Sequence, residues 1–253
     1  IRPFYDVDLI KVITGIRRCG KSVILMQIID ELKEKGIKEE QIVYINFEFI
    51  DYAEITSAKA FNDYVEEKLV NNQKYYLFFD EIQNVDKWEK VVNSFKAKYQ
   101  EKVSIFITGS NSDLLSGELA THIAGRYVSF QIYPFTFKEV CELKKIDIQD
   151  KYNLEKEFNN FIIWGGMPQR FAMPDENQIK TYLSDVYNSI VVKDIIERFK
   201  IKDIDLFNRI LTYIITTPSQ TFSAESLSNY LLKENMEVSK ATIYNYLEYM
   251  CRA

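Results

Sequence analysis

Eight residues near the start of the chain have the types and spacing of a phosphate-binding loop. Gly15-Ile-Arg-Arg-Cys-Gly-Lys-Ser22 fits the pattern G-x-x-x-x-G-K-[ST]. In such a loop backbone N–H groups turn inward around phosphate oxygens, and the following helix N-terminus adds partial positive charge. We expect Lys21 to reach the β- and γ-phosphates and Ser22 to bind Mg²⁺. The predicted nucleotide-contacting residues of this segment are Gly15, Ile16, Arg17, Arg18, Cys19, Gly20, Lys21, Ser22 and Val23.

A pair of carboxylates follows a second apolar segment. Tyr75–Phe79 is too short for a helix, which predicts a buried strand, and it ends in Asp80-Glu81. At the end of such a strand Asp80 would hold Mg²⁺, usually through water, and Glu81 would orient and polarise the attacking water. The alternative is that the pair only begins a loop or caps the helix near Trp88.

The elements around these motifs alternate between strand and helix. The expected strands are 9–14, 41–47, 75–79, 103–108 and 127–132, and the expected helices are 22–35, 57–69 and 88–99. Continuous apolar strands separated by helices predict an α/β fold, with a parallel sheet covered on both faces. Ligands of such sheets bind beyond the C-terminal ends of the strands, where the loop and the carboxylates fall.

The fourth expected strand is followed by Gly109-Ser110-Asn111. A polar side chain at this position can touch the γ-phosphate or the attacking water, so Asn111, or alternatively Ser110, is a candidate site residue. Taken alone, these three residues are also typical of an ordinary turn.

Composition narrows the function classes. The 253 residues give room for one large or two small domains. A net charge of −5 leaves no overall electrostatic footprint for nucleic acid. Because the sequence contains a single histidine, metal sites built from histidines and a Ser-His-Asp triad are disfavoured. Three widely spaced cysteines fit reduced thiols in a cytoplasmic protein, and no apolar segment is long enough to predict a membrane span.

The β pattern stops after about residue 141. We therefore predict three domains: a P-loop core over 1–140, an all-α lid over 141–217, and the start of a winged helix over 218–253. The lid contains an apolar stripe that we interpret as core, formed by Leu206, Phe207, Ile210, Leu211, Ile214 and Ile215. It also contains Gly165-Gly166 before Pro168, which predicts an unusual backbone or a corner between helices.

The last segment reads as two short helices joined by a tight turn, introduced by Ser223 and by Ser239. If this pair bound DNA, Lys240, Thr242 and Asn245 would face it. Residues 218–253 carry three basic and four acidic side chains, a net charge of −1. A module without positive charge binds phosphate backbones poorly, so packing or docking of a protein partner is favoured.

Taken together, these motifs resemble prokaryotic AAA-type ATPases of the STAND class. The resemblance covers most of the chain and rests on six segments: Gly15–Ser22, Phe79–Gln83, Thr108–Asn111, Gly125-Arg126, Pro134-Phe135 and Gly165–Pro168. Members of that class join the ATPase to a winged helix and often to a nuclease-like C-terminal domain. No segment of these 253 residues corresponds to that last domain, so nuclease activity cannot be claimed for this chain.

The resemblance implies further roles. Gly166-Met167-Pro168 is similar to the G-x-P motif of that class, whose proline packs near the nucleotide base, so ATP or ADP would lie between sheet and lid. Arg126 corresponds to an arginine that senses the γ-phosphate, acts as a finger toward a neighbour, or anchors a loop. The implied partners are therefore nucleotide and either a second copy or another protein, contacted through the lid and the winged helix.

Two functions remain open at this point. The first is an Mg²⁺-dependent ATPase that acts as a nucleotide-controlled switch, with Lys21, Glu81, Asn111 and Arg126 as catalytic candidates, and Ser22 and Asp80 as metal ligands. The second is an ATP-regulated DNA-binding protein. A GTPase is disfavoured because it would need an Asn-Lys-x-Asp motif, and the sequence contains no Asn-Lys pair.

Overall fold

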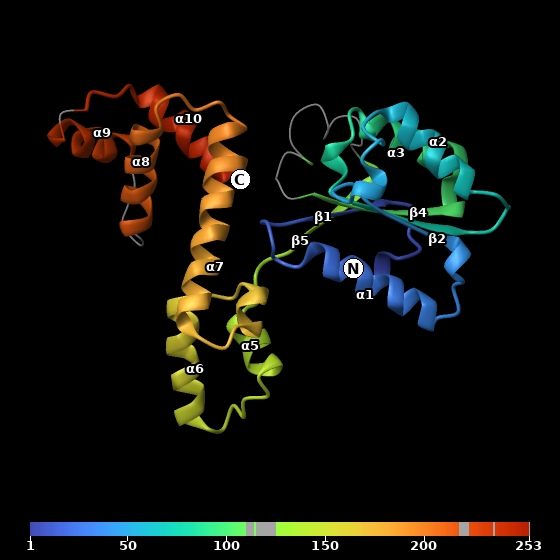
Figure 1. Cartoon of the computed structure of the whole chain (residues 1–253), viewed down its shortest axis with the longest axis horizontal. Helices are drawn as coiled ribbons and strands as arrows, with labels where there is room; N and C mark the ends of the chain where they lie inside the picture. Colours follow the sequence, from blue (N-terminus) through green and yellow to red (C-terminus); the bar gives the residue numbers. More distant parts are fainter. Residues whose placement is uncertain (110–113, 115–124, 218–222, 235, 253) are drawn as a thin grey trace. The chain divides into compact units, whose positions relative to one another are not determined.

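The structure is a computed structural model that describes residues 1–109, 114, 125–217, 223–234 and 236–252 (Figure 1). They divide into two compact units, Ile1–Lys180 and Thr181–Ala253. The three-domain division with boundaries after residues 140 and 217 stays a prediction, which this two-way division leaves open.

A five-stranded sheet forms the centre of the first unit. Its strands are β1 (Ile10–Thr14), β2 (Ile42–Asn46), β3 (Tyr75–Asp80), β4 (Val103–Gly109) and β5 (Tyr127–Gln131). All neighbouring pairs are parallel, in the order β2-β3-β4-β1-β5. The predicted α/β fold with a parallel sheet is therefore confirmed. Because β1 lies inside the sheet and next to β4, the loop that follows β1 opens at the centre of the C-terminal edge.

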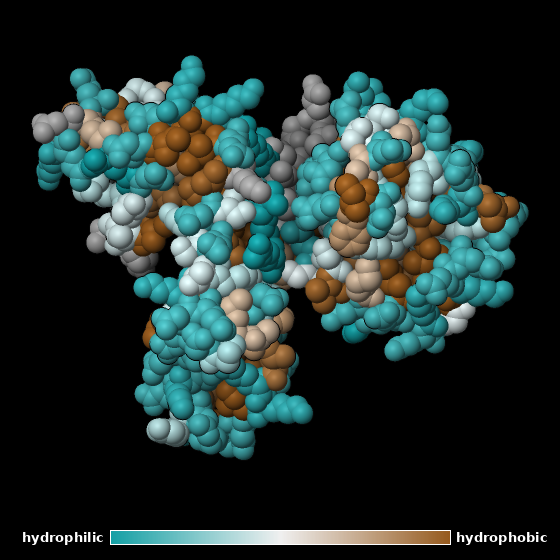
Figure 2. All heavy atoms as spheres, in the orientation of Figure 1, coloured by the Kyte–Doolittle hydropathy of each residue, from teal (hydrophilic) through white to brown (hydrophobic). Residues whose placement is uncertain are grey.

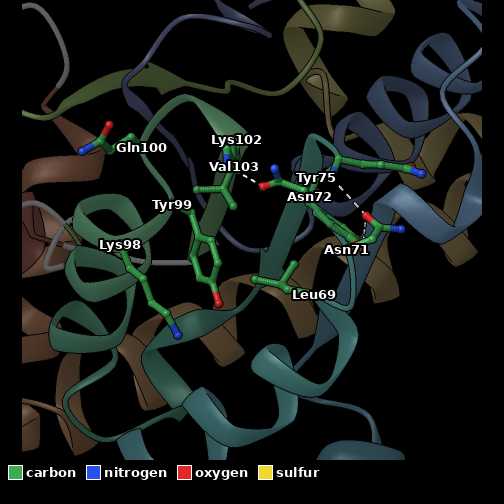
Figure 3. Close-up of a pocket in the computed structure, with 10 residues that line it drawn as sticks. Leu69, Asn71, Asn72, Tyr75, Lys98, Tyr99, Gln100, Lys102 and Val103 are labelled. Carbon is green, nitrogen blue, oxygen red and sulfur yellow. Dashed lines mark hydrogen bonds between the residues drawn. The ribbon is translucent and has the colours of Figure 1, made fainter.

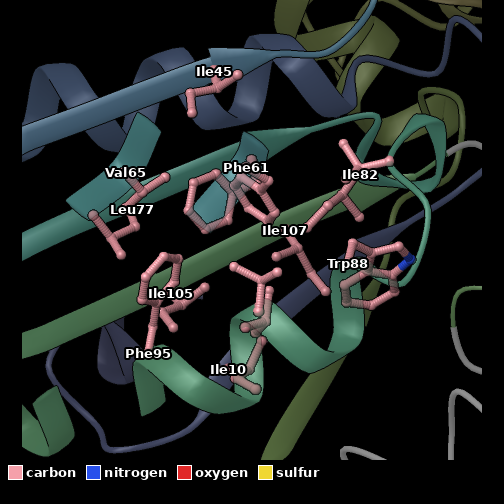
Figure 4. Close-up of a cluster of buried hydrophobic side chains, with 14 of the residues drawn as sticks. Ile10, Ile45, Phe61, Val65, Leu77, Ile82, Trp88, Phe95, Ile105 and Ile107 are labelled. Carbon is pink, nitrogen blue, oxygen red and sulfur yellow. The ribbon is translucent and has the colours of Figure 1, made fainter. Parts of the chain in front are cut away.

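Helices cover both faces of this sheet. The helix α1 (Lys21–Glu34) packs on one face, and α2 (Ala58–Lys68) and α3 (Trp88–Tyr99) pack on the other (Figure 1). Successive residues of β3 alternate between the two cores, so every residue of this strand is buried. Figure 4 shows the larger core, where Phe61, Leu77 and Phe95 meet between β3 and the helices.

Short 3-10 turns join these elements. They are η1 (Arg2–Phe4), η2 (Glu39–Gln41), η3 (Ile50–Tyr52), η4 (Ile82–Asn84) and η5 (Gln100–Lys102). The helical part of the first unit follows β5 and contains α5 (Phe137–Leu143), α6 (Lys151–Trp164) and η7 (Pro168–Ala172). Thr136 and Glu139 form a capping box at the start of α5.

The second unit is helical. The helix α7 (Glu176–Ser189) begins before its boundary, and the unit continues with π-helical η8 (Ile190–Glu197), α8 (Ile204–Thr216), α9 (Ala224–Lys233) and α10 (Lys240–Cys251). Most of the predicted stripe on α8 packs in the core, with Leu206, Phe207 and Ile210 buried. Ile215 is the exception, because it lies in the last turn of α8 and is 55% exposed.

Charged and polar side chains cover most of the face that Figure 2 shows, with smaller apolar patches between them. Among the described helices, none combines the length and the apolar composition that crossing a membrane requires.

One lysine is buried within the sheet. Lys11 in β1 has an exposed fraction of 0%, and its Nζ donates to Val7 O at 2.8 Å and to Ser104 Oγ at 2.7 Å. Burial, with a smaller contribution from the charge of Lys74, lowers the pKa of Lys11 from 10.5 to about 8. The charged form of Lys11 is therefore disfavoured in the folded protein.

This lowered pKa predicts a pH-dependent stability. Between pH 8 and 10.5 the folded lysine loses its proton while the unfolded lysine keeps it, so stability rises with pH in this window. Relative to Lys11→Met, the wild-type free energy of unfolding should rise by up to about 1.4 kcal/mol per pH unit there. Urea unfolding of both proteins across the window measures the difference, since other groups titrate equally in both. A difference that does not vary with pH would contradict this prediction.

Candidate nucleotide site

The phosphate-binding loop connects β1 to α1 at the C-terminal edge of the sheet. Gly20, the residue before the helix, has φ 108°, a conformation that favours glycine. The helix begins at Lys21, one residue earlier than predicted, and Lys21 is 4% exposed. Its Nζ donates to Gly15 O at 3.0 Å and to Ile16 O at 3.2 Å, so the lysine folds back over its own loop.

The two sequence motifs meet at this edge. Lys21 Nζ lies 3.7 Å from Glu81 Oε1, and both side chains are almost fully buried. Glu81 directly follows the last residue of β3, Asp80, which has an exposed fraction of 0%. The structure thus brings Lys21 to Glu81, the neighbour of Asp80 in the sequence, as expected from parallel strands whose C-terminal ends share one edge.

Asp80 is held by three neutral donors. Tyr44 OH donates to Asp80 Oδ2 at 3.0 Å and Asn46 Nδ2 donates to the same oxygen at 3.1 Å. Thr108 Oγ1 donates to Asp80 Oδ1 and accepts the backbone N–H of Glu81 at 3.0 Å. Burial, followed by the charge of Asp80, raises the pKa of Tyr44, which keeps its hydroxyl a donor.

These residues fit a bound Mg²⁺. No lysine or arginine of the described residues forms an ion pair with Asp80, so its buried charge lacks a cationic partner within the described chain. Ser22, in the first turn of α1, adds a hydroxyl of the hard oxygen type that Mg²⁺ prefers. The described residues contain no group of three or more His, Cys, Asp or Glu suited to a metal. Mg²⁺ in nucleotide sites typically uses one or two carboxylates together with phosphates.

A cavity of about 370 Å³ adjoins the loop. It is lined by the start of α1, by the segment after β5, and by one residue of η7; the lining residues are Cys19, Gly20, Val23, Ile24, Gln27, Gln131, Ile132, Tyr133, Pro134, Phe135, Thr136, Glu139 and Pro168. Its size is in the range of small-molecule sites. Pro168 therefore lines the same cavity as Gly20, although the two are far apart in sequence.

The Gly165-Gly166 pair brings η7 to this cavity. Gly165 ends α6 with φ 68°, the unusual backbone that the sequence predicted. Gly166 allows a close contact between two backbone segments. Its O accepts from Phe135 N at 2.8 Å, and a Cβ at this position would lie 1.9 Å from Phe135 O. Only a residue without a side chain allows η7 to approach the segment after β5 so closely.

Other predicted residues have different placements. Of the loop residues, Ile16 and Arg17 are half-buried and Arg18 is exposed. Burial raises the pKa of the Cys19 thiol, which keeps it protonated. Val23 is 60% exposed and contributes to the cavity wall. Asn111 and Ser110 lie outside the described residues.

Arg126 is not brought to the phosphate-binding loop. It precedes β5, and its O accepts from Ile10 N at 2.8 Å, at the first residue of β1. The loop follows the last residue of β1, so Arg126 lies at the opposite edge of the sheet. A strand of five residues spans roughly 16 Å.

Sequence reasoning missed Tyr44, Asn46 and Thr108. Asn46 and Thr108 are polar residues within the last two positions of the predicted strands 41–47 and 103–108, which is a usable signal, because such positions face the site in a parallel sheet. Tyr44 lies two residues before the end of β2, and nothing in the sequence predicts that its hydroxyl contacts Asp80.

A second hollow of about 360 Å³ lies near the other ends of β3 and β4 (Figure 3). Several of its polar side chains already have partners: Tyr75 OH donates to Asn71 Oδ1 at 2.9 Å, and Lys102 donates to Asn72. We assign it no ligand.

The helix pair α9–α10 forms as predicted, each helix capped by its expected serine. The candidate DNA-facing residues are partly engaged within the unit. Lys240 Nζ lies 3.9 Å from Glu225 Oε2, and Thr242 Oγ1 shares a hydrogen bond with Ser239 Oγ at 2.9 Å. Asn245 is exposed.

Comparisons with known proteins identify the family of this chain. A family model described as an AAA domain matches residues 8–141, and a domain of unknown function (DUF8612) matches residues 155–253. An uncharacterized protein of Haemophilus influenzae is 40% identical over 246 residues, covering 97% of this chain and 60% of that protein. The uncharacterized protein MJ1544 of Methanocaldococcus jannaschii is 36% identical over 250 residues, covering 96% of this chain and 55% of that protein.

The chain thus spans little more than half the length of these relatives. Among solved structures, the Orc1 protein of Aeropyrum pernix in complex with DNA matches with a TM-score of 0.42 and 12% identity, covering 95% of this chain and 76% of that one. The family model covers more than half of the chain and includes both nucleotide motifs. The chain therefore belongs to the AAA domain family.

Proposed function

We propose that this chain is an Mg²⁺-dependent ATPase that acts as a nucleotide-controlled switch. An AAA domain implies ATP binding and hydrolysis. The observation that carries the proposal is the meeting of Lys21 and Glu81 at 3.7 Å beside the buried Asp80. This arrangement provides a cation for phosphates, a carboxylate for water, and a carboxylate for a metal at one edge of the sheet.

Each residue then has a defined task. The loop amides and Lys21 bind the phosphates, while Asp80 and Ser22 would hold Mg²⁺, which neutralises charge on the β- and γ-phosphates when bound. Glu81 accepts a proton from the attacking water as the new P–O bond forms and the bond to ADP breaks. Thr108 and Asn46 fix the carboxylate of Asp80, so little reorganisation is needed during the reaction.

The switch part of the proposal rests on the cavity beside the loop. Pro168 of η7 and Cys19 of the loop line the same space, which is suited to the nucleotide base. Nucleotide contact with both segments would couple occupancy of the site to the position of the helices that follow. The Gly166-Met167-Pro168 turn supports assignment to the STAND class. Arg126 would act as a finger only toward a second copy, since it lies away from its own loop.

Calorimetric titration with ATP and ADP, with and without Mg²⁺, tests binding, and phosphate release tests hydrolysis. We expect Mg²⁺-dependent ATP binding and measurable turnover. Hydrogen exchange at Gly165–Ala172 should slow when ATP is added, because base contacts would order η7. Absence of nucleotide binding would exclude the ATPase, whereas binding and turnover without a change at η7 would exclude only the switch.

A further inference from the structure

Glu81 lies in a strained and firmly fixed turn. Its φ is 53°, in the left-handed region that non-glycine residues rarely adopt. The next residue, Ile82, has an exposed fraction of 0% and packs in the core shown in Figure 4. Asn84 N donates to Glu81 O at 3.2 Å, which closes the turn η4. The backbone of Glu81 is thus held by its neighbours, which leaves its side chain to be positioned separately.

The side chain of Gln83 reaches back to Glu81. Its Nε2 donates to Glu81 Oε2 at 2.6 Å. A carboxylate only accepts hydrogen bonds, so the amide must present its NH₂ group to it. The other carboxylate oxygen, Oε1, lies 3.7 Å from Lys21 Nζ. The two oxygens of Glu81 therefore have different neighbours: Gln83 holds one, and the other faces the phosphate-binding loop.

The surroundings of the Gln83 amide allow this orientation, but they leave one of its polar atoms without a hydrogen-bond partner among the described residues. Gln83 Oε1 is buried and accepts no hydrogen bond from the part of the chain that the structure describes. A Cβ at position 109 would lie 2.6 Å from this Oε1 and 1.6 Å from Leu114 Cδ1, so Gly109 leaves the space that the amide needs. A buried acceptor without a partner is unfavourable for folding. Such a group in a native structure calls for an explanation other than stability.

We propose that Gln83 is a positioning residue for Glu81. Its amide occupies Oε2 and fixes the carboxylate, so that Oε1 is directed to the attacking water beside Lys21. In the reaction Glu81 takes one proton from water while the new P–O bond forms and ADP leaves; Gln83 transfers no proton. This inference rests on the proposed ATPase function.

Gln83→Met tests the inference, because methionine keeps the length of the side chain but removes the donor. We expect kcat to fall about 10- to 100-fold, the effect of a misplaced catalytic group. The ATP dissociation constant should stay within about threefold, since Gln83 would act on Glu81 and not on the phosphates. The urea midpoint should change little, because the substitution removes one unpaired buried acceptor, Gln83 Oε1, and leaves another, Glu81 Oε2. Gln149→Met, at an exposed glutamine, is the matched control and should keep wild-type kcat.

A double-mutant comparison separates positioning from a general structural effect. In a Glu81→Gln background, Gln83→Met should lower the residual rate less than twofold, because the group it positions is already inactive. An unchanged kcat for Gln83→Met in an active protein, or an equal loss in both backgrounds, would overturn the inference alone. A wild-type protein that hydrolyses no ATP would remove the proposed function and this inference together.

Discussion

Lys21→Ala should reduce ATP affinity at least about 100-fold and abolish turnover. Lys21 is 4% exposed, and its Nζ lies 3.7 Å from Oε1 of Glu81, the proposed base. Hydrogen bonds to charged groups contribute about 1.5–3 kcal/mol each, and every 1.4 kcal/mol changes affinity about tenfold. Since Lys21 would contact two phosphates, both contributions are lost together. Calorimetric titration with Mg²⁺ and ATP measures the change directly.

The control must separate a lost phosphate contact from a distorted loop. Lys21 also donates to Gly15 O and Ile16 O, so its removal could disturb the loop itself. Lys21→Met keeps most of the side-chain volume without the charge and should behave like Lys21→Ala. Lys59→Ala, at a side chain that is 88% exposed, should bind ATP as wild type does. Equal ATP affinity for wild type and both Lys21 variants would show that the nucleotide site is misassigned.

Much of the fold could be predicted because its determinants are local. The apolar run Tyr75–Phe79 marks β3, and Asp80 ends it in the structure as in the prediction. The loop from Gly15 to Ser22 requires a strand before it and a helix after it, and both are present. One rule, that ligands bind beyond the C-terminal ends of parallel strands, was then enough to predict that these motifs lie together.

Details that depend on register or on close packing were not accessible from the sequence. The polar residue that contacts Asp80 from β4 is Thr108, the partner of Ile13 in the parallel ladder with β1. The sequence pattern did not mark Thr108 as a neighbour of Asp80, because register cannot be determined from one strand alone. Its prediction that Asn111, or alternatively Ser110, touches the γ-phosphate or the attacking water concerns a different contact and stays a prediction. The reason for glycine at position 166 is likewise tertiary, since it depends on how closely Phe135 approaches.

The placement of Arg126 shows the same limit. Its position just before a strand is clear from the sequence, but the edge to which it belongs follows from strand direction. Because β5 runs parallel to β1, a residue before β5 lies far from a loop that follows β1. The motif therefore identifies Arg126 as an arginine of the family pattern. It does not indicate whether the arginine would contact the nucleotide of its own chain or that of a second copy.

Two carboxylates near the loop compete for the role of base. Glu48 follows β2, and its backbone N–H donates to Asn46 Oδ1 at 2.9 Å, next to the residue that holds Asp80. Desolvation of its carboxyl, followed by the charge of Glu81, raises the pKa of Glu48. Glu48 is exposed, whereas Glu81 is 8% exposed and forms an ion pair with Lys21. Burial beside Lys21, the lysine proposed to bind phosphate, favours Glu81, because a base must be held against the water it activates.

Glu81→Gln should therefore lower kcat at least about 100-fold, since general bases contribute roughly 10²–10⁴ in rate. Glutamine keeps the size of the side chain and can still accept from Gln83, so the turn should be preserved. It removes the ion pair with Lys21, which leaves the ammonium more available to phosphate, and ATP affinity should be equal or higher. Single-turnover hydrolysis and equilibrium binding separate the two effects.

Glu48→Gln changes the neighbouring carboxylate and is the matched control. It should retain kcat within about threefold of wild type. The reverse pattern, with Glu48→Gln inactive and Glu81→Gln active, would transfer the role of base to Glu48 while leaving the nucleotide site in place.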